Sequence, residues 1–229
     1  MGKDGFDKLV IAIDGPAGAG KSTVAKMVAE GLGLKYIDTG AMYRALTLKA
    51  MEEGVDCGDG RLLTELLKRS KIEIKAGKSG GPALIFLDDE DVSAKIRLPE
   101  INRRVSQVAR VPEVRREFVK LQRGLATGGG VVMDGRDIGT VVLPQADIKI
   151  YLTASLKERV RRRHAELLAR GVYISLQETK EQVVERDRGD RGRKVGPLRL
   201  APDAHHIDTT GFTPKEITEK IVALVNERG

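Results

Sequence analysis

The stretch Gly15-Pro-Ala-Gly-Ala-Gly-Lys-Ser22 decides the fold, because it matches the phosphate-binding pattern G-x-x-x-x-G-K-[ST]. The apolar run Leu-Val-Ile-Ala-Ile at residues 9–13 precedes it and is typical of a buried parallel strand. Residues 23–32 follow with apolar side chains at helical spacing. In a strand–loop–helix unit of this kind, backbone N–H groups and the positive end of the helix surround phosphate oxygens. We therefore predict a P-loop that binds a nucleoside triphosphate.

Other polar residues are expected to complete this phosphate site. Lys21 should reach the β- and γ-phosphates, and the hydroxyl of Ser22 should bind Mg²⁺. Asp134 ends the apolar run at residues 131–133, which is the position of a Walker-B carboxylate that orients Mg²⁺ and its waters. Asp14 is a weaker candidate for a place near the same metal. The predicted triphosphate-binding residues are Gly15, Pro16, Ala17, Gly18, Ala19, Gly20, Lys21, Ser22 and Thr23, and the predicted metal ligands are Ser22 and Asp134.

Composition limits the class of protein. The chain has 229 residues, a formal net charge of +7 and an aromatic content of 3% with no Trp. Scarce aromatic residues argue against single-stranded nucleic acid binding, which uses them to stack bases. Cys57 is the only cysteine in the sequence, so an intramolecular disulfide and a cysteine-based zinc cluster are excluded. No apolar run is long enough to span a bilayer, so we expect a soluble cytoplasmic protein with no membrane partner and no specific nucleic-acid partner.

Short apolar runs alternate with helical segments along most of the chain. Strands are expected at residues 9–13, 35–37, 131–133, 147–152 and 205–208. This alternation predicts an α/β fold, a parallel sheet flanked by helices. Residues 71–92 differ, because two apolar runs around the turn cluster at 77–82 predict a small antiparallel hairpin. The three glycines at 128–130 predict a flexible connection.

Residues 185–193, Glu-Arg-Asp-Arg-Gly-Asp-Arg-Gly-Arg, are rich in arginine. Phosphoryl transfer accumulates negative charge, and arginine side chains clamp phosphates in two-point geometry. Gly189 and Gly192 would permit hinging, so we interpret the stretch to about residue 199 as a lid that closes over the reactants. A solvated charged loop explains the same composition equally well. The arginines of the stretch are Arg186, Arg188, Arg191 and Arg193.

A P-loop alone leaves several classes of protein open. A regulatory GTPase would need the guanine-reading motif Asn-Lys-x-Asp, which the sequence lacks. A motor ATPase or helicase usually needs a longer chain. The size of this chain favours a kinase that acts on a small acceptor.

Five motifs together resemble those of the bacterial-type cytidylate kinases, P-loop nucleoside monophosphate kinases that phosphorylate CMP and dCMP with ATP. In chain order they are Ile13-Asp-Gly-Pro-Ala-Gly-Ala-Gly-Lys-Ser-Thr23, Asp38-Thr-Gly-Ala-Met-Tyr-Arg44, Ser106-Gln-Val-Ala109 with Pro112 and Val114-Arg115, Asp134-Gly-Arg-Asp-Ile-Gly-Thr140, and Arg186-Asp187 with Asp190 and Arg193. The resemblance runs from about residue 11 to the C-terminal helix. It implies one kinase domain with a core at about 1–38, 128–157 and 200–229, a monophosphate-binding insertion at about 39–127 and a lid region at about 158–199.

The resemblance also implies roles for individual residues. The CMP phosphate would be held by Thr39, Arg44, Arg136 and Arg193. The cytosine edge would be read by Ser106, Arg115 and Asp137, and the sugar hydroxyls would be bound by Arg186 and Asp190. As catalytic residues we expect Lys21, Arg136, Arg191 and Arg193.

The identity of the acceptor rests mainly on this resemblance. An alternative is a kinase for another monophosphate or for a small metabolite such as shikimate. A further alternative is a basic regulator that binds nucleotides or nucleic acids without turnover. The expectation that we carry forward is a monomer that uses ATP, CMP and dCMP, with Mg²⁺ as cofactor.

Overall fold

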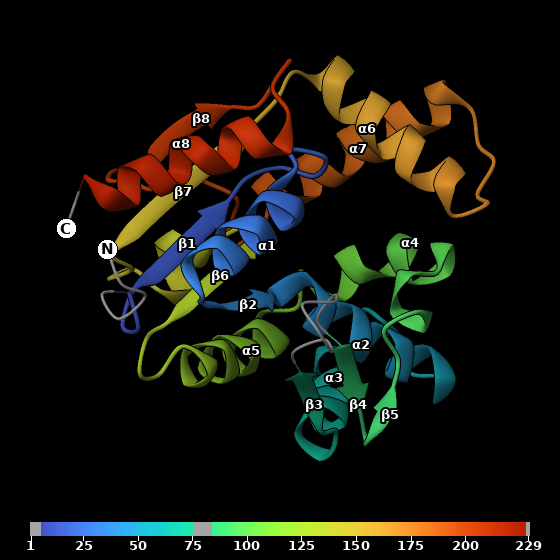
Figure 1. Ribbon diagram of the computed structural model, residues 1–229. Coiled ribbons are helices and arrows are strands. Elements are labelled where there is room, and N and C mark those ends of the chain that lie inside the picture. Colours follow the sequence, from blue (N-terminus) through green and yellow to red (C-terminus); the bar gives the residue numbers. More distant parts are fainter. Residues whose placement is uncertain (1–5, 76–83, 228–229) are drawn as a thin grey trace.

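The centre of the molecule is a parallel sheet. The computed structural model describes residues 6–75 and 84–227, and within them the sheet has five strands in the order β2-β6-β1-β7-β8 (Figure 1). Their bounds are Val10–Asp14 for β1, Lys35–Asp38 for β2, Val131–Gly135 for β6, Ile148–Thr153 for β7 and His205–Asp208 for β8. The predicted α/β fold with a parallel sheet is confirmed.

The register of the strands aligns their carboxyl ends. Asp38 of β2 lies opposite Asp134 of β6, and Asp14 of β1 lies opposite Gly135. The P-loop after β1, the helix after β2 and the turn after β6 therefore leave the sheet at one edge. Ligands of open parallel sheets bind at this edge.

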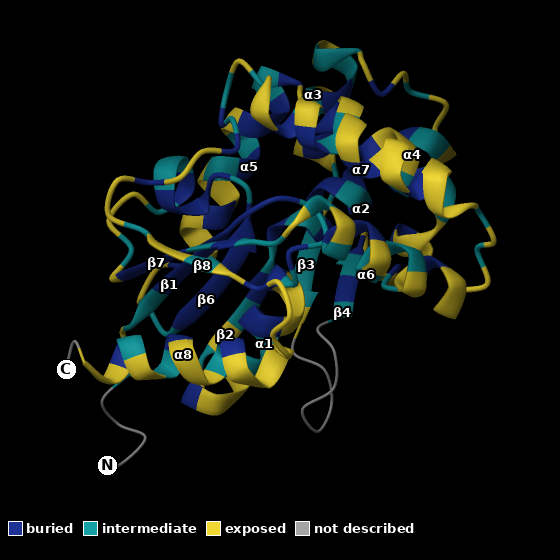
Figure 2. Ribbon diagram, turned by 90° about the horizontal axis from the view of Figure 1, so that it is seen from above, coloured by how far each residue is buried: buried dark blue, intermediate teal, exposed yellow. Residues whose placement is uncertain are grey.

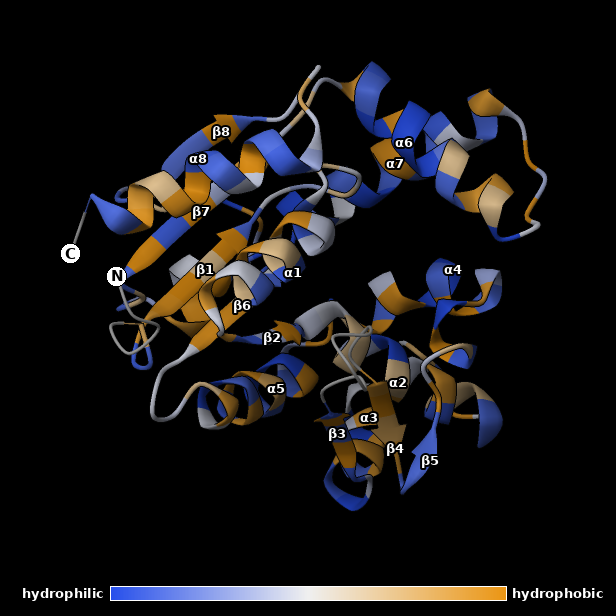
Figure 3. Ribbon diagram, viewed as in Figure 1, coloured by the Kyte–Doolittle hydropathy of each residue, from blue (hydrophilic) through white to orange (hydrophobic). Residues whose placement is uncertain are grey.

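Aliphatic side chains fill both faces of the sheet. On one face, Ile11 and Ile13 pack with helices α1 (Lys21–Leu32) and α8 (Pro214–Asn226). On the other face, Ala12 packs with residues of the turn after β6. Figure 3 shows β1, β6 and β7 as mostly hydrophobic, and Figure 2 shows them as mostly buried. No helix in the described part of the chain has the length and apolar character that a membrane crossing needs.

The glycines at 128–130 form a shaped turn, so the predicted flexible connection is wrong. All three have positive φ, at 91°, 76° and 65°. A Cβ on Gly129 would lie 2.1 Å from the carbonyl oxygen of Lys8, so only glycine permits this approach. The turn leads into β6, where the N–H of Val131 donates to the carbonyl oxygen of Leu9 at 2.9 Å.

Between β2 and β6 the chain forms a mainly helical insertion with cores of its own. The helices are α2 (Thr39–Glu52), α3 (Gly60–Arg69), α4 (Pro99–Val108), α5 (Pro112–Leu125) and a 3₁₀ turn at Lys95–Arg97. The expected hairpin is present as β3 (Ile72–Lys75) and β4 (Leu84–Leu87), and a third short strand, β5 (Glu90–Asp91), extends it. The turn cluster expected at 77–82 lies outside the described residues.

Between β7 and β8 the helices α6 (Leu156–Ala169) and α7 (Leu176–Arg191) form a hairpin that projects from the sheet (Figure 1). The arginine-rich stretch is therefore helical as far as Arg191, and Gly189 lies inside α7 rather than at a hinge. A Cβ on Gly189 would lie 2.3 Å from a guanidinium nitrogen of Arg110, which follows α4. Gly192, with φ at −83°, only follows the last helical turn.

Candidate active site

Two cavities meet at the carboxyl edge of the sheet. The P-loop cavity has a volume of about 1730 Å³ and is bounded by residues 17–23 of the P-loop and by parts of α4, α6 and α7. The arginine cavity has a volume of about 90 Å³ and lies beside it. The lining residues that the two cavities share are Ser22, Asp38, Ser106, Arg136 and Arg186.

The P-loop backbone has the shape that its glycines predict. Gly15, Gly18 and Gly20 have positive φ values of 148°, 78° and 85°. A Cβ on Gly15 would lie 2.0 Å from the carbonyl oxygen of Leu152, so only glycine lets the loop pass this close to β7. Helix α1 begins at Lys21, and its first turn lines the P-loop cavity. The free N–H groups and positive end of a helix therefore belong to this cavity.

Lys21 is held within the loop. Its side chain is buried, and Nζ donates to the carbonyl oxygen of Pro16 at 2.8 Å. Burial, together with the positive charge of Arg136, lowers the pKa of Lys21 well below its usual range. A phosphate in the cavity would counter this shift, because a nearby negative charge favours the ammonium form.

A hydroxyl and a carboxylate meet where the sequence predicts the metal. Ser22 Oγ donates to one oxygen of Asp134 at 2.9 Å, and Tyr36 Oη donates to the other at 2.9 Å. Burial and the nearby charge of Asp38 raise the pKa of Asp134 to about 6. Oxygen donors suit Mg²⁺, which commonly takes one or two carboxylates and completes its shell with water and phosphate. Residues 6–75 and 84–227 contain no cluster of three or more His, Cys, Asp or Glu arranged for a metal, so these groups fit Mg²⁺ only together with water and phosphate.

The arginine cavity gathers all the residues that the resemblance assigned to CMP. They come from α2, α4, α5, the turn after β6, and α7 with its following loop. The nine residues are Thr39, Arg44, Ser106, Arg115, Arg136, Asp137, Arg186, Asp190 and Arg193. Both predicted metal ligands line the same cavity.

Asp190 is the centre of a charged network in this cavity. It is 1% exposed, and it accepts a hydrogen bond from Arg136 Nε at 2.6 Å and another from Arg193. Burial favours the neutral acid, but the charges of Arg136 and Arg193 hold the pKa of Asp190 well below its usual range. The Nε atoms of Arg186 and Arg193 are buried without a hydrogen-bond partner. Unmet cationic donors of this kind suit a bound anion.

Arg115 and Asp137 form a second buried ion pair. Arg115 is 2% exposed and donates to Asp137 and, at 3.4 Å, to the carbonyl oxygen of Ala109. The ring centre of Tyr43 lies 5.7 Å from the guanidinium carbon. Gly196, with φ at 59°, covers the pair, since a Cβ there would lie 2.1 Å from Asp137 Oδ2. A side chain at position 196 would therefore displace the pair.

Other predicted residues have separate surroundings. The hydroxyl of Thr39 donates to the carbonyl oxygen of Asp134 at 2.8 Å, which fixes the start of α2 against β6. Arg44 Nε donates to Asn102 Oδ1 at 3.4 Å. Arg191 is exposed at the end of α7 and lines neither cavity, so the structure does not bring it to the other predicted catalytic residues.

Asp14 connects the P-loop to the turn that carries Arg136 and Asp137. Its two carboxylate oxygens accept the N–H groups of Ile138 and Gly139, each at 2.8 Å. Burial raises the pKa of Asp14 to about 7, although these hydrogen bonds act in the opposite direction. Both oxygens are engaged and the residue lines neither cavity, which favours a structural role over a place at the metal.

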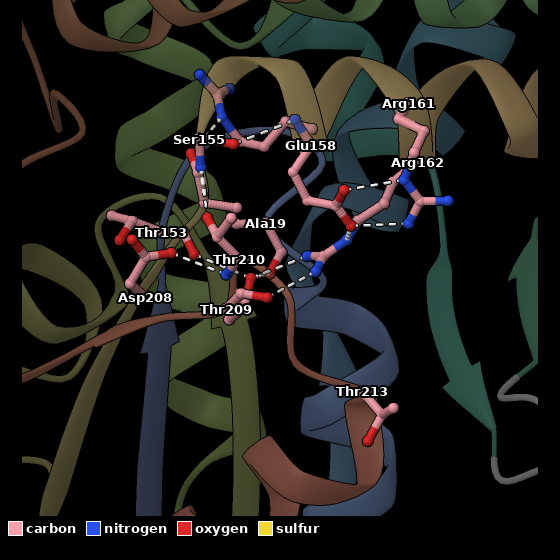
Figure 4. A network of polar contacts seen from close by, with 12 residues as sticks. Ala19, Thr153, Ser155, Glu158, Arg161, Arg162, Asp208, Thr209, Thr210 and Thr213 are labelled. Carbon is pink, nitrogen blue, oxygen red and sulfur yellow. Dashed lines mark hydrogen bonds and ion pairs between the residues drawn. The ribbon is translucent and has the colours of Figure 1, made fainter.

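A hydrogen-bond network forms one wall of the P-loop cavity (Figure 4). Arg162 donates to the hydroxyl and carbonyl oxygens of Thr209 at 2.8 and 2.7 Å and to Glu158 at 2.7 Å. Arg161 donates to the same carboxylate at 2.9 and 2.7 Å. The hydroxyl of Thr209 lies within hydrogen-bond distance of the carbonyl oxygens of Thr153, at 2.9 Å, and Ala19, at 3.2 Å. The network ties α6 and the loop after β8 to the P-loop.

Sequence reasoning missed four residues of the site. Tyr36 and Asp38 could have been found, because they lie at the carboxyl end of a predicted strand beside the P-loop strand. Gly196 and Thr209 contact site residues that are distant in sequence, so no local sequence pattern identifies them as site residues.

Comparisons with known proteins show the family of this chain. A family model described as Cytidylate kinase matches residues 11–227. The cytidylate kinase of Geobacillus thermodenitrificans (strain NG80-2) is 54% identical over 221 residues, which are 96% of this chain and 98% of that protein. The cytidylate kinase of Pelotomaculum thermopropionicum (strain DSM 13744 / JCM 10971 / SI) is 52% identical over 216 residues, which are 94% and 95% of the two chains.

Among solved structures, an uncharacterized protein from Eubacterium ventriosum ATCC 27560 superposes with a TM-score of 0.53 at 11% identity, covering 96% of this chain and 99% of that one. This likeness concerns the fold alone. The family match and the two relatives, in contrast, extend over nearly the whole chain and confirm the resemblance drawn from five motifs. The chain belongs to the cytidylate kinase family.

Proposed function

We propose that the protein phosphorylates CMP and dCMP with ATP by placing ATP in the P-loop cavity and the monophosphate in the arginine cavity. The observation that carries the proposal is the junction of the two cavities. Ser22, Arg136 and Arg186 line both, so a γ-phosphate held by the P-loop would face a monophosphate held by the arginines. Direct transfer needs donor and acceptor in such an arrangement.

On the donor side, the P-loop N–H groups would bind the β- and γ-phosphates. Lys21 would leave the carbonyl oxygen of Pro16 and contact the γ-phosphate, where its charge is most needed. Ser22 and Asp134 would hold Mg²⁺, which when bound neutralises charge on the phosphate oxygens. The triphosphate would contact residues along the whole stretch 15–23.

On the acceptor side, the phosphate would take over hydrogen bonds that Asp190 makes now. Arg136 and Arg193 are paired with this carboxylate, and a phosphate brings the same charge and more acceptor oxygens. Thr39 and Arg44 would complete the phosphate site. Freed Asp190, with Arg186, would bind the sugar hydroxyls. The volume of about 90 Å³ is smaller than the roughly 300 Å³ of the smallest typical ligand pockets, so α7 and the insertion must separate to admit CMP.

Arg115, Asp137 and Ser106 would read the base. Cytosine presents an amino donor beside a ring acceptor. The carboxylate of Asp137 would accept from the amino group, and the guanidinium of Arg115 would donate to the ring nitrogen. Uracil reverses both groups. Each unpaired buried group costs about 1–3 kcal/mol, so two reversals imply roughly a hundredfold preference for CMP over UMP.

A coupled assay with ATP, Mg²⁺ and a panel of acceptors tests this function. We expect CMP and dCMP to have the highest kcat/KM, UMP to be about a hundredfold poorer, and chelation of Mg²⁺ to stop turnover reversibly. Equal use of CMP and AMP would overturn the cytidylate assignment and leave the phosphotransferase in place.

We also propose that the enzyme is a cytoplasmic monomer. It should have no specific nucleic-acid partner, because its densest cluster of arginines would bind the substrate phosphate. Sedimentation of the purified chain tests the monomer. Binding to DNA and RNA at physiological salt tests the second statement, and tight sequence-selective binding would contradict it.

A further inference from the structure

The turn after β6 begins with an aspartate that does not cap it. Residues Ile138–Val142 form a short π-helical turn, and Asp137 stands at its N-cap position without making a capping hydrogen bond. An aspartate at an N-cap normally accepts the N–H of the second or third residue of its helix, which here are Gly139 and Thr140. Asp137 does not make this local bond.

Asp14 of β1 supplies the cap instead. Its two carboxylate oxygens accept the N–H groups of Ile138 and Gly139, each at 2.8 Å. All three residues are buried, and buried N–H groups need a partner. The N–H of Gly139, which the side chain of Asp137 would cap in an ordinary helix start, is therefore taken by Asp14.

The carboxylate of Asp137 is directed into the arginine cavity. There it pairs with Arg115 of α5, and both side chains are buried. Asp14 lies on the other side of the turn and lines neither cavity. It is nevertheless close to Asp137, because burial raises the pKa of Asp14 to about 7 and the charge of Asp137 adds to this effect. One carboxylate thus serves the backbone and the other serves Arg115.

Helix α5 holds the other end of the turn. Arg123 donates to the carbonyl oxygens of Val141 and Val142 at 2.8 and 2.9 Å. The same helix carries Arg115, so the turn and Arg115 are fixed to one element. Loss of the cap at Asp14 should therefore change mainly the side-chain conformation of Asp137.

We propose that Asp14 is a positioning residue for base selection, which caps the turn and so keeps the carboxylate of Asp137 beside Arg115. This rests on the proposed function, in which Asp137 accepts from the amino group of cytosine. Without Asp14 the N–H of Gly139 is buried and unpaired, and the carboxylate at the N-cap, Asp137, can accept it. The acceptor for cytosine is then lost, although Asp14 itself lines neither cavity.

Steady-state kinetics of Asp14→Asn and Asp14→Ala test the proposal, with CMP and UMP as acceptors. We expect the ratio of kcat/KM for CMP to that for UMP to narrow about tenfold in Asp14→Ala, and about threefold in Asp14→Asn, which keeps one acceptor oxygen. A residue that served only stability would lower kcat/KM for both nucleotides in proportion and leave the ratio unchanged. Thermal melts show whether each variant is folded, and the nearly isosteric Asp14→Asn carries the test if Asp14→Ala does not fold.

Asp147 offers a matched control at the opposite end of β1. Its carboxylate also accepts a backbone N–H, that of Val10 at 2.8 Å, and it lines neither cavity. Asp147→Asn should keep the ratio within about twofold of wild type.

The double variant of Asp14→Ala and Asp137→Asn shows whether Asp14 acts through Asp137. If it does, the ratio should stay within about twofold of that of Asp137→Asn alone, whereas independent effects would multiply. Multiplied effects, or a wild-type ratio in a folded Asp14 variant, would overturn the proposal. A wild-type enzyme that is inactive on CMP, or that uses CMP and UMP equally, would overturn the proposed function instead.

Discussion

The P-loop cavity and the arginine cavity would hold phosphate by opposite means. The first uses backbone N–H groups from one continuous stretch of nine residues and a single buried cation, Lys21. The second would use side-chain charges from five separate elements, and its own carboxylates, Asp137 and Asp190, pair with three of the arginines, Arg115, Arg136 and Arg193. The comparison shows that ATP would fill a preformed cradle, whereas CMP would have to displace internal ion pairs.

The largest effect should come from the P-loop side. Lys21→Met keeps the length and the apolar stem of the side chain and removes the charge that would contact the transferred phosphoryl group. We expect kcat to fall about a thousandfold, or about 4 kcal/mol, with little change in melting temperature. Steady-state kinetics and thermal melts of Lys21→Met measure both quantities, with Lys35→Met, at an exposed position, as the control. Turnover like wild type in folded Lys21→Met would refute the role of the P-loop lysine.

On the arginine side, removal of the carboxylate should cost stability as well as activity. Asp190→Asn leaves Arg136 and Arg193 buried without their counterion, and breaking a buried pair typically costs about 3 kcal/mol or more. We expect inorganic phosphate or CMP to restore much of this loss, because either anion can replace the carboxylate. Denaturant titrations with and without phosphate measure the effect.

The exposed pair Lys71–Asp89 offers a matched control for that experiment. Asp89→Asn should change the free energy of unfolding by less than about 1 kcal/mol, with no response to phosphate. If Asp190→Asn behaved in the same way, the idea that Asp190 stands in for the substrate phosphate would fail.

A smaller effect is expected for base recognition. Asp137→Asn replaces one acceptor by an amide donor, so the ratio of kcat/KM for CMP to that for UMP should narrow about tenfold, or by 1.4 kcal/mol. The Michaelis constant for ATP should change little, because Asp137 lines only the arginine cavity. An unchanged ratio in the mutant would separate Asp137 from base selection.

The last effect depends on pH and concerns Asp14, which joins the P-loop strand to the turn that carries Arg136. Its pKa is raised to about 7 in the folded protein from 3.8. Between these values the folded state binds more protons than the unfolded state, so wild type should lose stability relative to Asp14→Asn as the pH rises from about 4 to 7, by at most about 1.4 kcal/mol per pH unit. Unfolding of both proteins at pH 5, 6, 7 and 8 measures this difference, and a constant difference would mean that Asp14 is ionised throughout.

Residue patterns predicted the sheet well but did not predict that the arginine-rich stretch is helical as far as Arg191. The β1 and β6 strands are continuous apolar runs. Such runs are buried whatever elements pack around them. In contrast, residues 186–191 contain a glycine and five charged side chains, which locally suggest a loop. In the structure they form the last turns of α7, where Arg159 and Arg136 from other elements pair with Asp187 and Asp190.

The sequence by itself determined the P-loop, since its glycines set the backbone of one short stretch and Lys21 bonds to a carbonyl oxygen within it. It also determined the family, since five motifs occur in one order. Only the tertiary structure decided that Asp190 neutralises Arg136 and Arg193, that Gly196 covers the Arg115–Asp137 pair, and that Arg191 stands apart from the site. These features depend on distances between elements far apart in the chain, and no local pattern of residues specifies such distances.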